Sequence, residues 1–270
     1  DGNLDQNRFF VEATPQIRYH NGALSLRAGL RLNYFSNNAD SVNYTNVGPD
    51  VEVSYAILPE ALTAFAGYTS GMQRNDLFDL YFENRYLSDS IFLKPSIETM
   101  NIFAGIKGQL NEEWDYTARV YYRRVENQLI YFAPDSVYRF DALYDSLTTT
   151  SGLYAGINYA VNDELSAGAA LSINNYGTST VERYFHAAPL RLDLYAKYVY
   201  QEKLTAHASL NLFGSTPMSI DSEGEIIRRS LFAGLNAGVD YRITEGFSVF
   251  LSVNNLLNSN YQRWHNYPER

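Results

Sequence analysis

The residues with catalytic potential are few. The chain of 270 residues has no cysteine and four histidines, at positions 20, 186, 207 and 265. His207, Ser209 and Asn211 alternate along one stretch, so they would share one face of a strand and bring a base near a hydroxyl. Any polar face of a strand produces such neighbours, and residues two apart on a strand seldom reach catalytic geometry. We therefore expect no catalytic residue and no enzyme activity.

Candidate metal ligands are equally sparse. Asp221, Glu223 and Glu225 form an acidic loop, and carboxylate oxygens are ligands that calcium prefers. Their spacing lacks the pattern of a calcium-binding loop, and the absence of cysteine excludes thiolate zinc sites. We expect a solvated surface loop here, no metal site and no cofactor.

The composition narrows the class of protein. Hydrophobic residues make up 46% of the chain, aromatic residues 15%, and 23 residues are tyrosine, which excludes a disordered chain. A formal net charge of −9 argues against a nucleic-acid partner, whose phosphates require a basic face. No apolar run approaches the roughly 18 residues of a membrane-spanning helix. A soluble globular protein and a membrane β-barrel both remain.

The period of the apolar residues distinguishes these two classes. From Ala23 to Tyr34 apolar residues alternate with polar ones, as in Leu24, Ser25, Leu26 and Arg27. Successive side chains of a strand point to opposite faces, so each such strand has one apolar and one polar face. We find no convincing amphipathic helix. The alternation recurs at 51–57, 114–122, 165–173, 190–198 and 231–243.

Short turns alternate with long polar loops along the chain. The alternation predicts about twelve strands, and one end of the sheet would carry only short turns, as in outer-membrane barrels whose short turns are periplasmic. The predicted strands lie near 8–20, 23–35, 50–58, 61–69, 98–110, 114–132, 150–161, 164–176, 189–200, 203–213, 228–243 and 247–257. The short turns lie at 21–22, 59–61, 111–113, 162–163, 202–203 and 244–246, and the long loops at 36–49, 71–96, 133–149, 177–188 and 214–228.

Aromatic residues flank the short turns on the apolar face. Tyrosine and tryptophan favour the boundary between membrane and water, so we predict a periplasmic aromatic girdle. Strands favour tyrosine in general, which keeps a soluble β-sandwich open as an alternative. Together with the unequal turns, the pattern predicts an all-β fold: a transmembrane antiparallel meander β-barrel that is part of a larger barrel. The girdle residues are Tyr19, Tyr55, Trp114, Tyr116, Tyr159, Tyr198 and Tyr241.

The opposite face of the same strands carries charges of both signs. Such a wall must contact water, a plug or a solute, or be paired, because unpaired buried charge is costly. Ladders of ion pairs that only hold the wall together are the alternative, and no single-sign constriction is visible. The residues predicted to face the lumen are Arg18, Arg27, Arg31, Asp50, Glu52, Arg119, Arg123, Arg191, Asp193, Lys197, Asp240 and Arg242.

Two segments resemble a known family. An alternating strand at 247–253 runs into Asn254-Asn255-Leu256-Leu257-Asn258, followed by Tyr261 and by Tyr267-Pro268. Residues 79–81 lead through a long loop to Leu93-Lys94-Pro95-Ser96. Both resemble the barrel of TonB-dependent outer-membrane receptors, and the 262–264 segment looks more like barrels from Bacteroidota. The resemblance implies a bacterial outer-membrane location, energised uptake of a bulky or scarce nutrient, and a periplasmic energy-coupling partner.

The family's other parts have no match in residues 1–270. Neither a plug domain with its TonB-contacting segment nor a final strand ending in an aromatic residue is present. We therefore expect a single domain, an outer-membrane β-barrel incomplete at both ends, with outer-membrane lipid as its surroundings. The alternative function is a plugless barrel that serves as an accessory or scaffold subunit, with other outer-membrane subunits as partners in protein assembly or secretion.

Overall fold

The alternating segments form one antiparallel sheet. The computed structural model describes residues 8–37, 42–88, 91–134, 138–160, 162 and 164–269. Within these ranges a sheet of 13 strands runs in the order β1-β3-β4-β5-β6-β7-β8-β9-β10-β11-β14-β15, with β2 also paired to β3. Its strands are β1 (Arg8–Ala13), β2 (Gln16–Asn21), β3 (Leu24–Asn37), β4 (Val42–Leu58), β5 (Leu62–Gln73), β6 (Ser96–Asn111), β7 (Trp114–Phe132), β8 (Asp141–Ala160), β9 (Leu165–Gly177), β10 (Leu190–Tyr200), β11 (Leu204–Phe213), β14 (Phe232–Thr244) and β15 (Phe247–Val253).

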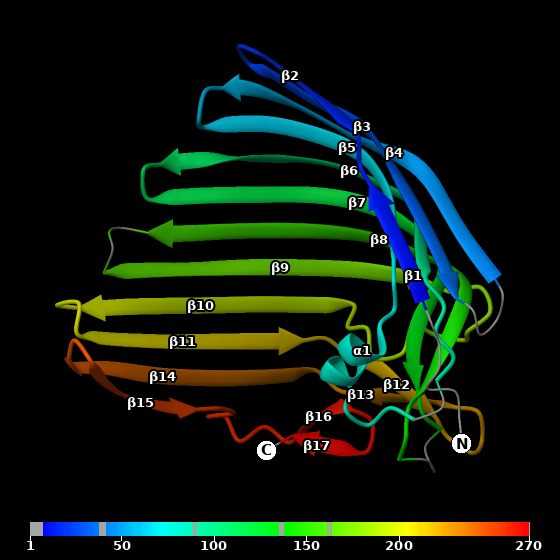
Figure 1. Cartoon of the computed structure of the whole chain (residues 1–270). Helices are drawn as coiled ribbons and strands as arrows, with labels where there is room; N and C mark the ends of the chain where they lie inside the picture. Colours follow the sequence, from blue (N-terminus) through cyan, green and yellow to red (C-terminus); the bar gives the residue numbers. More distant parts are fainter. Residues whose placement is uncertain are drawn as a thin grey trace.

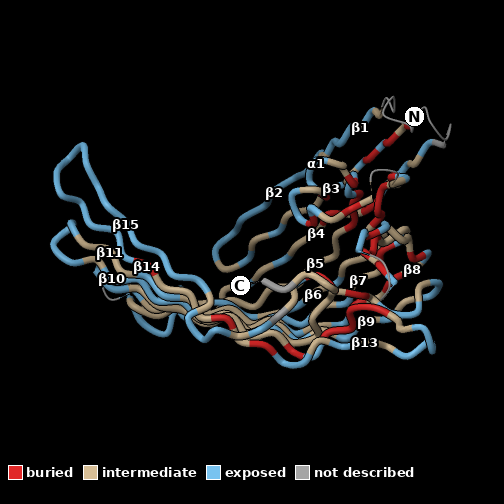
Figure 2. The backbone as a smooth tube through the Cα atoms, turned by 90° about the horizontal axis from the view of Figure 1, so that it is seen from below, coloured by how far each residue is buried: buried red, intermediate tan, exposed pale blue. Residues whose placement is uncertain are grey.

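The sheet is a curved, open trough. Figure 1 shows the strands side by side, with the short turns at one end and the long connections at the other. Figure 2 shows the sheet bending so that β2 to β5 form one arm and β10, β11, β14 and β15 the other. Among the described strands, β15 pairs only with β14, and β1 and β2 pair only with β3. The meander and the unequal turns are confirmed, and the visible part is an unclosed section of a barrel.

The apolar face of this trough is uncovered. Leu30 is 51% exposed, and most large apolar side chains on the same face are exposed in strand after strand. No second sheet packs on this face among the described strands, so the fold is not a β-sandwich. An exposed apolar band of this extent is what lipid covers in a transmembrane barrel. It includes Leu24, Leu26, Val53, Ile57, Ile102, Ile106, Val120, Leu153, Ile173, Val239, Ile243, Val249 and Leu251.

The strands extend further than predicted at the long-loop end. β4 begins at Val42 and β8 at Asp141, inside segments predicted as loops 36–49 and 133–149. Beyond the membrane both faces of a strand meet water, so the alternation of polarity disappears and the prediction stops too early. The predicted strand 8–20 is also wrong in detail, because it is split at Thr14-Pro15 into β1 and β2.

Pro15 explains that split. A proline has no backbone N–H, so it interrupts the ladder and is found at bulges and edges. Here its carbonyl still accepts the N–H of Leu30 at 3.1 Å. A Cβ at Gly29 would lie 2.6 Å from the same carbonyl oxygen, so only glycine allows this close approach. Asp163 and residues 38–41 and 135–137, which fall in predicted turns and loops, lie outside the described residues.

Small elements fold over the long-loop end. The short helix α1 (Leu77–Glu83) was not predicted, and Asp76 caps it by accepting the N–H of Phe78 at 3.0 Å. Two hairpins, β12 (Thr216–Ile220) with β13 (Ile226–Arg229) and β16 (Tyr261–Trp264) with β17 (Tyr267–Glu269), also lie at this end (Figure 1). No helix among the described residues is long and apolar enough to cross a membrane.

The largest buried apolar cluster belongs to these elements. We call it the cap cluster; it joins α1, its following loop, the upper part of β7 and the β16–β17 hairpin. Phe140 is fully buried at its centre, with Trp264 at 5.5 Å between ring centroids. The long loops thus form a packed cap. The buried members are Leu80, Leu87, Leu93, Leu129, Tyr131, Ala133, Phe140 and Trp264.

The two faces of β3 predict opposite responses to the same substitution. Leu30→Arg on the apolar face should lower the free energy of unfolding by about 2–4 kcal/mol, because the charge enters lipid near mid-membrane. Ser25→Arg on the polar face should cost less than about 1 kcal/mol. Urea unfolding of the full-length protein in lipid vesicles measures both, and equal costs would contradict a lipid-facing leucine row.

Candidate functional site: the polar wall and its cavity

The candidate site is the polar, concave face of the sheet, called here the polar wall. The cross-strand register places all the residues predicted to face the lumen on this one face. Arg27, for example, lies opposite Arg18 on β2 and Glu52 on β4. At the other arm Lys197 lies opposite His207. The charges therefore share one surface along the whole trough.

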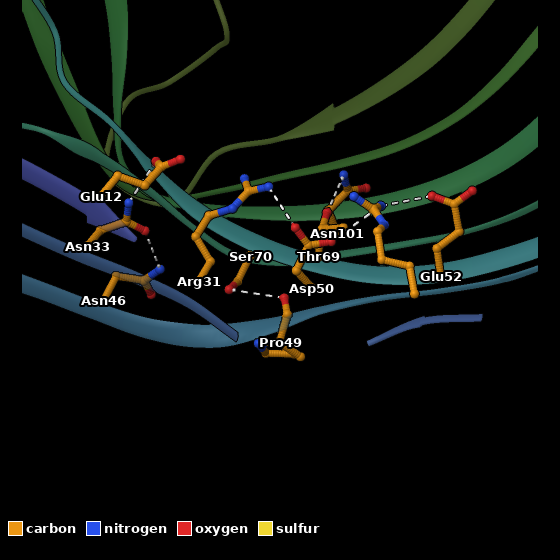
Figure 3. A network of polar contacts seen from close by, with 11 residues as sticks. Glu12, Arg31, Asn33, Asn46, Pro49, Asp50, Glu52, Thr69, Ser70 and Asn101 are labelled. Carbon is orange, nitrogen blue, oxygen red and sulfur yellow. Dashed lines mark hydrogen bonds and ion pairs between the residues drawn. The ribbon is translucent and has the colours of Figure 1, made fainter. Parts of the chain in front are cut away.

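Four of these residues form one network on β3 and β4. Asp50 is only 1% exposed, and its two oxygens lie 3.3 Å from Arg27 and 2.9 Å from Arg31. Arg27 also contacts Glu52 at 2.9 Å. Figure 3 shows the guanidinium of Arg31 pointing to the Asp50 carboxylate, with Glu52 on the same neighbouring strand. A carboxylate buried between two arginines is compensated, whereas either cation removed alone would leave uncompensated charge.

Neutral polar groups continue this network across the wall. Glu12 on β1 accepts a hydrogen bond from Asn33 at 2.9 Å, and Asn33 accepts one from Asn46 (Figure 3). On the other side, Asn101 of β6 donates to Thr69 of β5 at 3.2 Å. This sector is therefore a polar surface whose groups mostly satisfy one another.

Several of the remaining charged residues form separate pairs. Arg123 contacts Glu98 at 2.6 Å, and Arg191 contacts Asp193 at 2.7 Å. Further along, Asp240 lies 3.7 Å from His207, and Arg242 donates to the carbonyl of Glu202 at 2.7 Å. Arg119 instead lies over the rings of Tyr121 and Tyr154, at 5.6 and 5.4 Å. Arg18 and Lys197 have no ion-pair partner among the described residues.

Aromatic rings cover glycines of the neighbouring strand on the polar wall. Gly105 is paired with Phe65, and Gly67 with Phe103, in reciprocal positions of β5 and β6. A Cβ at Gly67 would lie 2.4 Å from the Phe103 ring, so any side chain there would displace the ring. The same arrangement recurs where Tyr195 covers Gly168. The inward glycines are thus explained by close packing of rings across the strands.

The predicted girdle residues lie on the apolar face beside the short turns. Tyr19 faces Leu26 and Tyr55 faces Leu24 in the register of β2, β3 and β4. Trp114 packs on the paired Tyr159 with ring centroids 4.4 Å apart. The others, Tyr116, Tyr198 and Tyr241, pair with the apolar residues Ile157, Leu165 and Leu204. Their role at a membrane boundary remains a prediction.

The residues considered for catalysis and metal binding have other contacts. His207 lies nearest to a carboxylate, that of Asp240, and makes no hydrogen bond with Ser209 among the described residues. Asp221 accepts the N–H groups of Glu223 at 2.9 Å and Glu225 at 2.8 Å, which closes a turn. In the described part of the chain no group of three or more His, Cys, Asp or Glu side chains is placed to hold a metal ion.

A cavity of about 850 Å³ lies between the polar wall and the cap. β9, β10, β11 and β14 supply its wall, and α1, the loop before β10, the end of β13, residues 254–255 after β15 and the β16–β17 hairpin supply the rest. Arg191 is the one residue of the predicted lumen-facing set in its lining. Sequence reasoning missed the cavity because Trp264, His186 and Glu83 reach it from segments that are distant along the chain.

Asp145 fixes the loop that carries His186. Its buried carboxylate accepts the backbone N–H groups of Ser179 at 3.0 Å, Thr180 at 2.7 Å and Val181 at 3.0 Å. The hydroxyl of Thr148 donates at 2.7 Å. Burial raises the pKa of Asp145, but the hydrogen bonds from Thr148, Val181 and Thr180 outweigh burial and hold this pKa below its ordinary value. The carboxylate is therefore charged at neutral pH.

His186 is neutral in this environment. Burial, reinforced by His265 nearby, lowers the pKa of His186 to about 3. The ring packs between Phe140 and Trp264, with centroids 5.2 and 5.0 Å away. His186 therefore packs on the cap cluster as an uncharged aromatic ring and also lines the cavity.

Comparison with known proteins identifies the class of protein. Residues 1–256 match the family described as TonB dependent receptor-like, beta-barrel. The chain belongs to this family, and it is a β-barrel protein of the bacterial outer membrane. The family and its solved relatives are receptors and transporters rather than enzymes. A comparison with curated protein sequences found no match.

Solved structures agree with this membership at the level of the fold. The ferripyoverdine receptor of Pseudomonas aeruginosa aligns with a TM-score of 0.66 and 18% identity, over 96% of this chain and 36% of the receptor. The ferric-catecholate import receptor Fiu of E. coli K12 aligns at 0.63 and 14%, over 96% and 41%. The FrpB iron transporter of Neisseria meningitidis aligns at 0.61 and 18%, over 97% and 43%. The chain thus spans about two fifths of these receptors.

The Asp145 contacts predict a local, pH-dependent effect. Asp145→Asn should lower the protection of the Ser179, Thr180 and Val181 amides by about 10–100-fold, because bonds to a charged acceptor are worth about 1.5–3 kcal/mol. Since the folded pKa is depressed, this stabilisation is present above about pH 4 and is lost as the pH falls through the folded value.

Hydrogen–deuterium exchange of segment 177–189, corrected for intrinsic exchange, measures the effect. The exposed Asp141 on the same strand provides the control variant Asp141→Asn, which should leave exchange unchanged. Equal exchange in wild type and Asp145→Asn at neutral pH would show that the carboxylate does not hold the loop.

Proposed function

We propose that the protein is an energy-coupled outer-membrane receptor for the uptake of a bulky or scarce nutrient. Membership of the TonB-dependent receptor-like family carries this proposal. The polar wall and a cavity of about 850 Å³ beneath a packed cap supply what such uptake requires: a wet surface along the lumen and a space for a solute. Among the solved relatives, one is a receptor bound to ferripyoverdine and another is a copper transporter.

The apolar face of the sheet supports one proposed partner, and the family supports another. The apolar face, with its row of exposed leucines and its tyrosines beside the short turns, suits outer-membrane lipid. TonB-dependent receptors work with a periplasmic energy-coupling protein, and we propose the same partner here. The scaffold alternative gains no support, because the solved relatives named above are receptors and transporters.

We further propose that residues 1–270 are a section of a longer barrel. The edges at β1–β2 and β15 are unpaired among the described strands, and each unpaired backbone group in lipid costs several kcal/mol. Additional strands that join these edges would satisfy them. The coverage of about two fifths of each solved receptor agrees with this proposal.

This proposal predicts that the section does not close by itself. Residues 1–270, expressed alone with a signal peptide, should show no heat-modifiable band on an SDS gel, because closed barrels resist SDS and an open sheet has two unpaired edges. The full-length protein prepared in parallel should show such a band. A heat-modifiable band from residues 1–270 would show that these strands close alone.

Energised uptake is tested in the native bacterium. A deletion strain grown under limitation of iron, of copper and of carbon source in turn should lose uptake of one nutrient, and the full-length gene should restore it. A protonophore should abolish this uptake while leaving ligand binding at the cell surface intact. Uptake that continues with the protonophore present would indicate a passive pore. A defect confined to the assembly of other outer-membrane proteins would favour the scaffold.

A further inference from the structure

The cavity beneath the cap carries an excess of positive charge. Three arginines line it, against one carboxylate, that of Glu83. The Glu83 carboxylate already accepts the hydroxyl of Tyr131 at 2.8 Å. The histidine of the lining, His186, is neutral and adds no charge. A ligand in this space therefore meets a field that favours negative charge.

Two of the guanidinium groups gather on one ring. Arg191 and Arg229 lie over Phe213, with distances of 5.4 and 5.7 Å to its centroid. Arg191 uses its Nε to contact Asp193 at 2.7 Å. Among the described residues, nothing accepts from the two terminal nitrogens of Arg191. These nitrogens are the pair that binds a carboxylate or phosphate in a bidentate manner.

The third guanidinium reaches the cavity from the cap. Arg263 lies on the β16–β17 hairpin, exposed, with its guanidinium 5.7 Å from the centroid of the Trp264 ring. It makes no ion pair and no side-chain hydrogen bond within the described part of the chain. Wall and cap thus each present a cation to the same space.

An asparagine of the lining adds a donor rather than an acceptor. The side-chain oxygen of Asn174 accepts the hydroxyl of Tyr121, and that of Asn236 accepts the N–H of Asn255 at 3.0 Å. The NH₂ group of Asn236 is therefore left for a ligand, whereas the Asn174 side chain also hydrogen-bonds the hydroxyl of Tyr176. Two other asparagines of the lining already donate through their NH₂ groups, Asn211 to Asp193 at 2.6 Å and Asn255 to the carbonyl of Ser259 at 3.0 Å.

From this geometry we propose that the cavity binds a ligand through oxyanion groups, carboxylate or phosphate, held by Arg191 on the wall and Arg263 on the cap. The proposal rests on the proposed function and names the chemical class of the nutrient or of its carrier. A neutral ligand would make no charge-assisted contact with either guanidinium group, whereas a carboxylate or phosphate makes such contacts with both. Cationic ligands would meet repulsion from the same guanidinium groups.

Isothermal titration of the full-length protein in detergent tests the ligand class. The probes are citrate for carboxylates, inorganic phosphate for phosphates, and maltotriose as an uncharged molecule. We expect at least one anion to bind and maltotriose to give no signal. Tighter binding of citrate than of phosphate assigns the carboxylate class, and the reverse order assigns the phosphate class. Binding of maltotriose as tight as that of both anions, or no binding of either anion, would overturn the proposal.

Variants assign the binding to the cavity. Arg191→Gln and Arg263→Gln should each weaken anion binding by about tenfold or more, because each removes a charge-assisted contact. Arg228→Gln is the matched control: it removes the same charge from an exposed residue of β13 that does not line the cavity. It should change the affinity by less than about twofold. An equal loss in Arg228→Gln would show a general charge effect and overturn the assignment.

Two further measurements keep the result clear. Heat modifiability on an SDS gel shows whether each variant is folded, and Arg263→Gln removes no ion pair within the described residues. Protonophore-sensitive uptake reports the proposed function separately. Uptake that remains energised while all variants bind anions as wild type does would reject the oxyanion site alone. Anion binding that depends on Arg191 and Arg263 without energised uptake would reject the function alone.

Discussion

The structure depends on one constraint: every backbone N–H and C=O group that enters lipid must be paired within the protein. The uninterrupted meander from β3 to β15 satisfies this constraint by joining each strand to its neighbours along the whole apolar band. Because one face of each strand then meets lipid and the other meets water, residues must alternate in polarity. The close approaches of Gly29 to Pro15 and of Gly67 to Phe103 keep the ladder intact where a proline or a large ring intrudes.

The polar wall has its own constraint, since charges beside a low-dielectric band must be compensated. The β3–β4 sector does this internally, with Asp50 buried between Arg27 and Arg31. The β10–β11 sector is less complete, because Arg191 contacts Asp193 through Nε alone among the described residues. The same type of residue thus holds the wall together in one sector and retains donors for a ligand in the other. The interpretation as an ion-paired ladder thus applies to the β3–β4 sector, and solute contact at the β10–β11 sector stays a proposal.

The sequence predicts the fold well where lipid constrains the strands, and poorly where the chain lies outside the lipid. Alternation is imposed by lipid, so the faces of Leu30 and Arg31, the meander and the short turns were predictable. Outside the lipid the constraint ends, and the first residues of β4 and β8 were mistaken for loops. The seven-residue helix α1 is too short to show a helical period, and Leu80 is its single buried residue. The cap depends on contacts such as Ser219 to Ala133, 86 residues apart, which no local pattern signals. For the same reason the sequence pointed to Arg263 and Trp264 only through the resemblance of segment 262–264 to other barrels, and not as residues of a cavity.

The cap and the wall contribute to one cavity, and this has a consequence for the proposed uptake. A ligand held by Arg191 and Arg263 together would contact a strand of the barrel and a hairpin of the cap at the same time. Its binding energy would therefore stabilise the arrangement in which the β16–β17 hairpin lies over the wall, because a ligand favours the state in which it makes more contacts. Trp264 anchors that hairpin on Phe140 and Tyr131, at centroid distances of 5.5 and 5.0 Å. Asp145 independently anchors the loop that carries His186. A contact with Arg191 on the wall and one with Arg263 on the cap would thus couple the proposed ligand to the position of the hairpin.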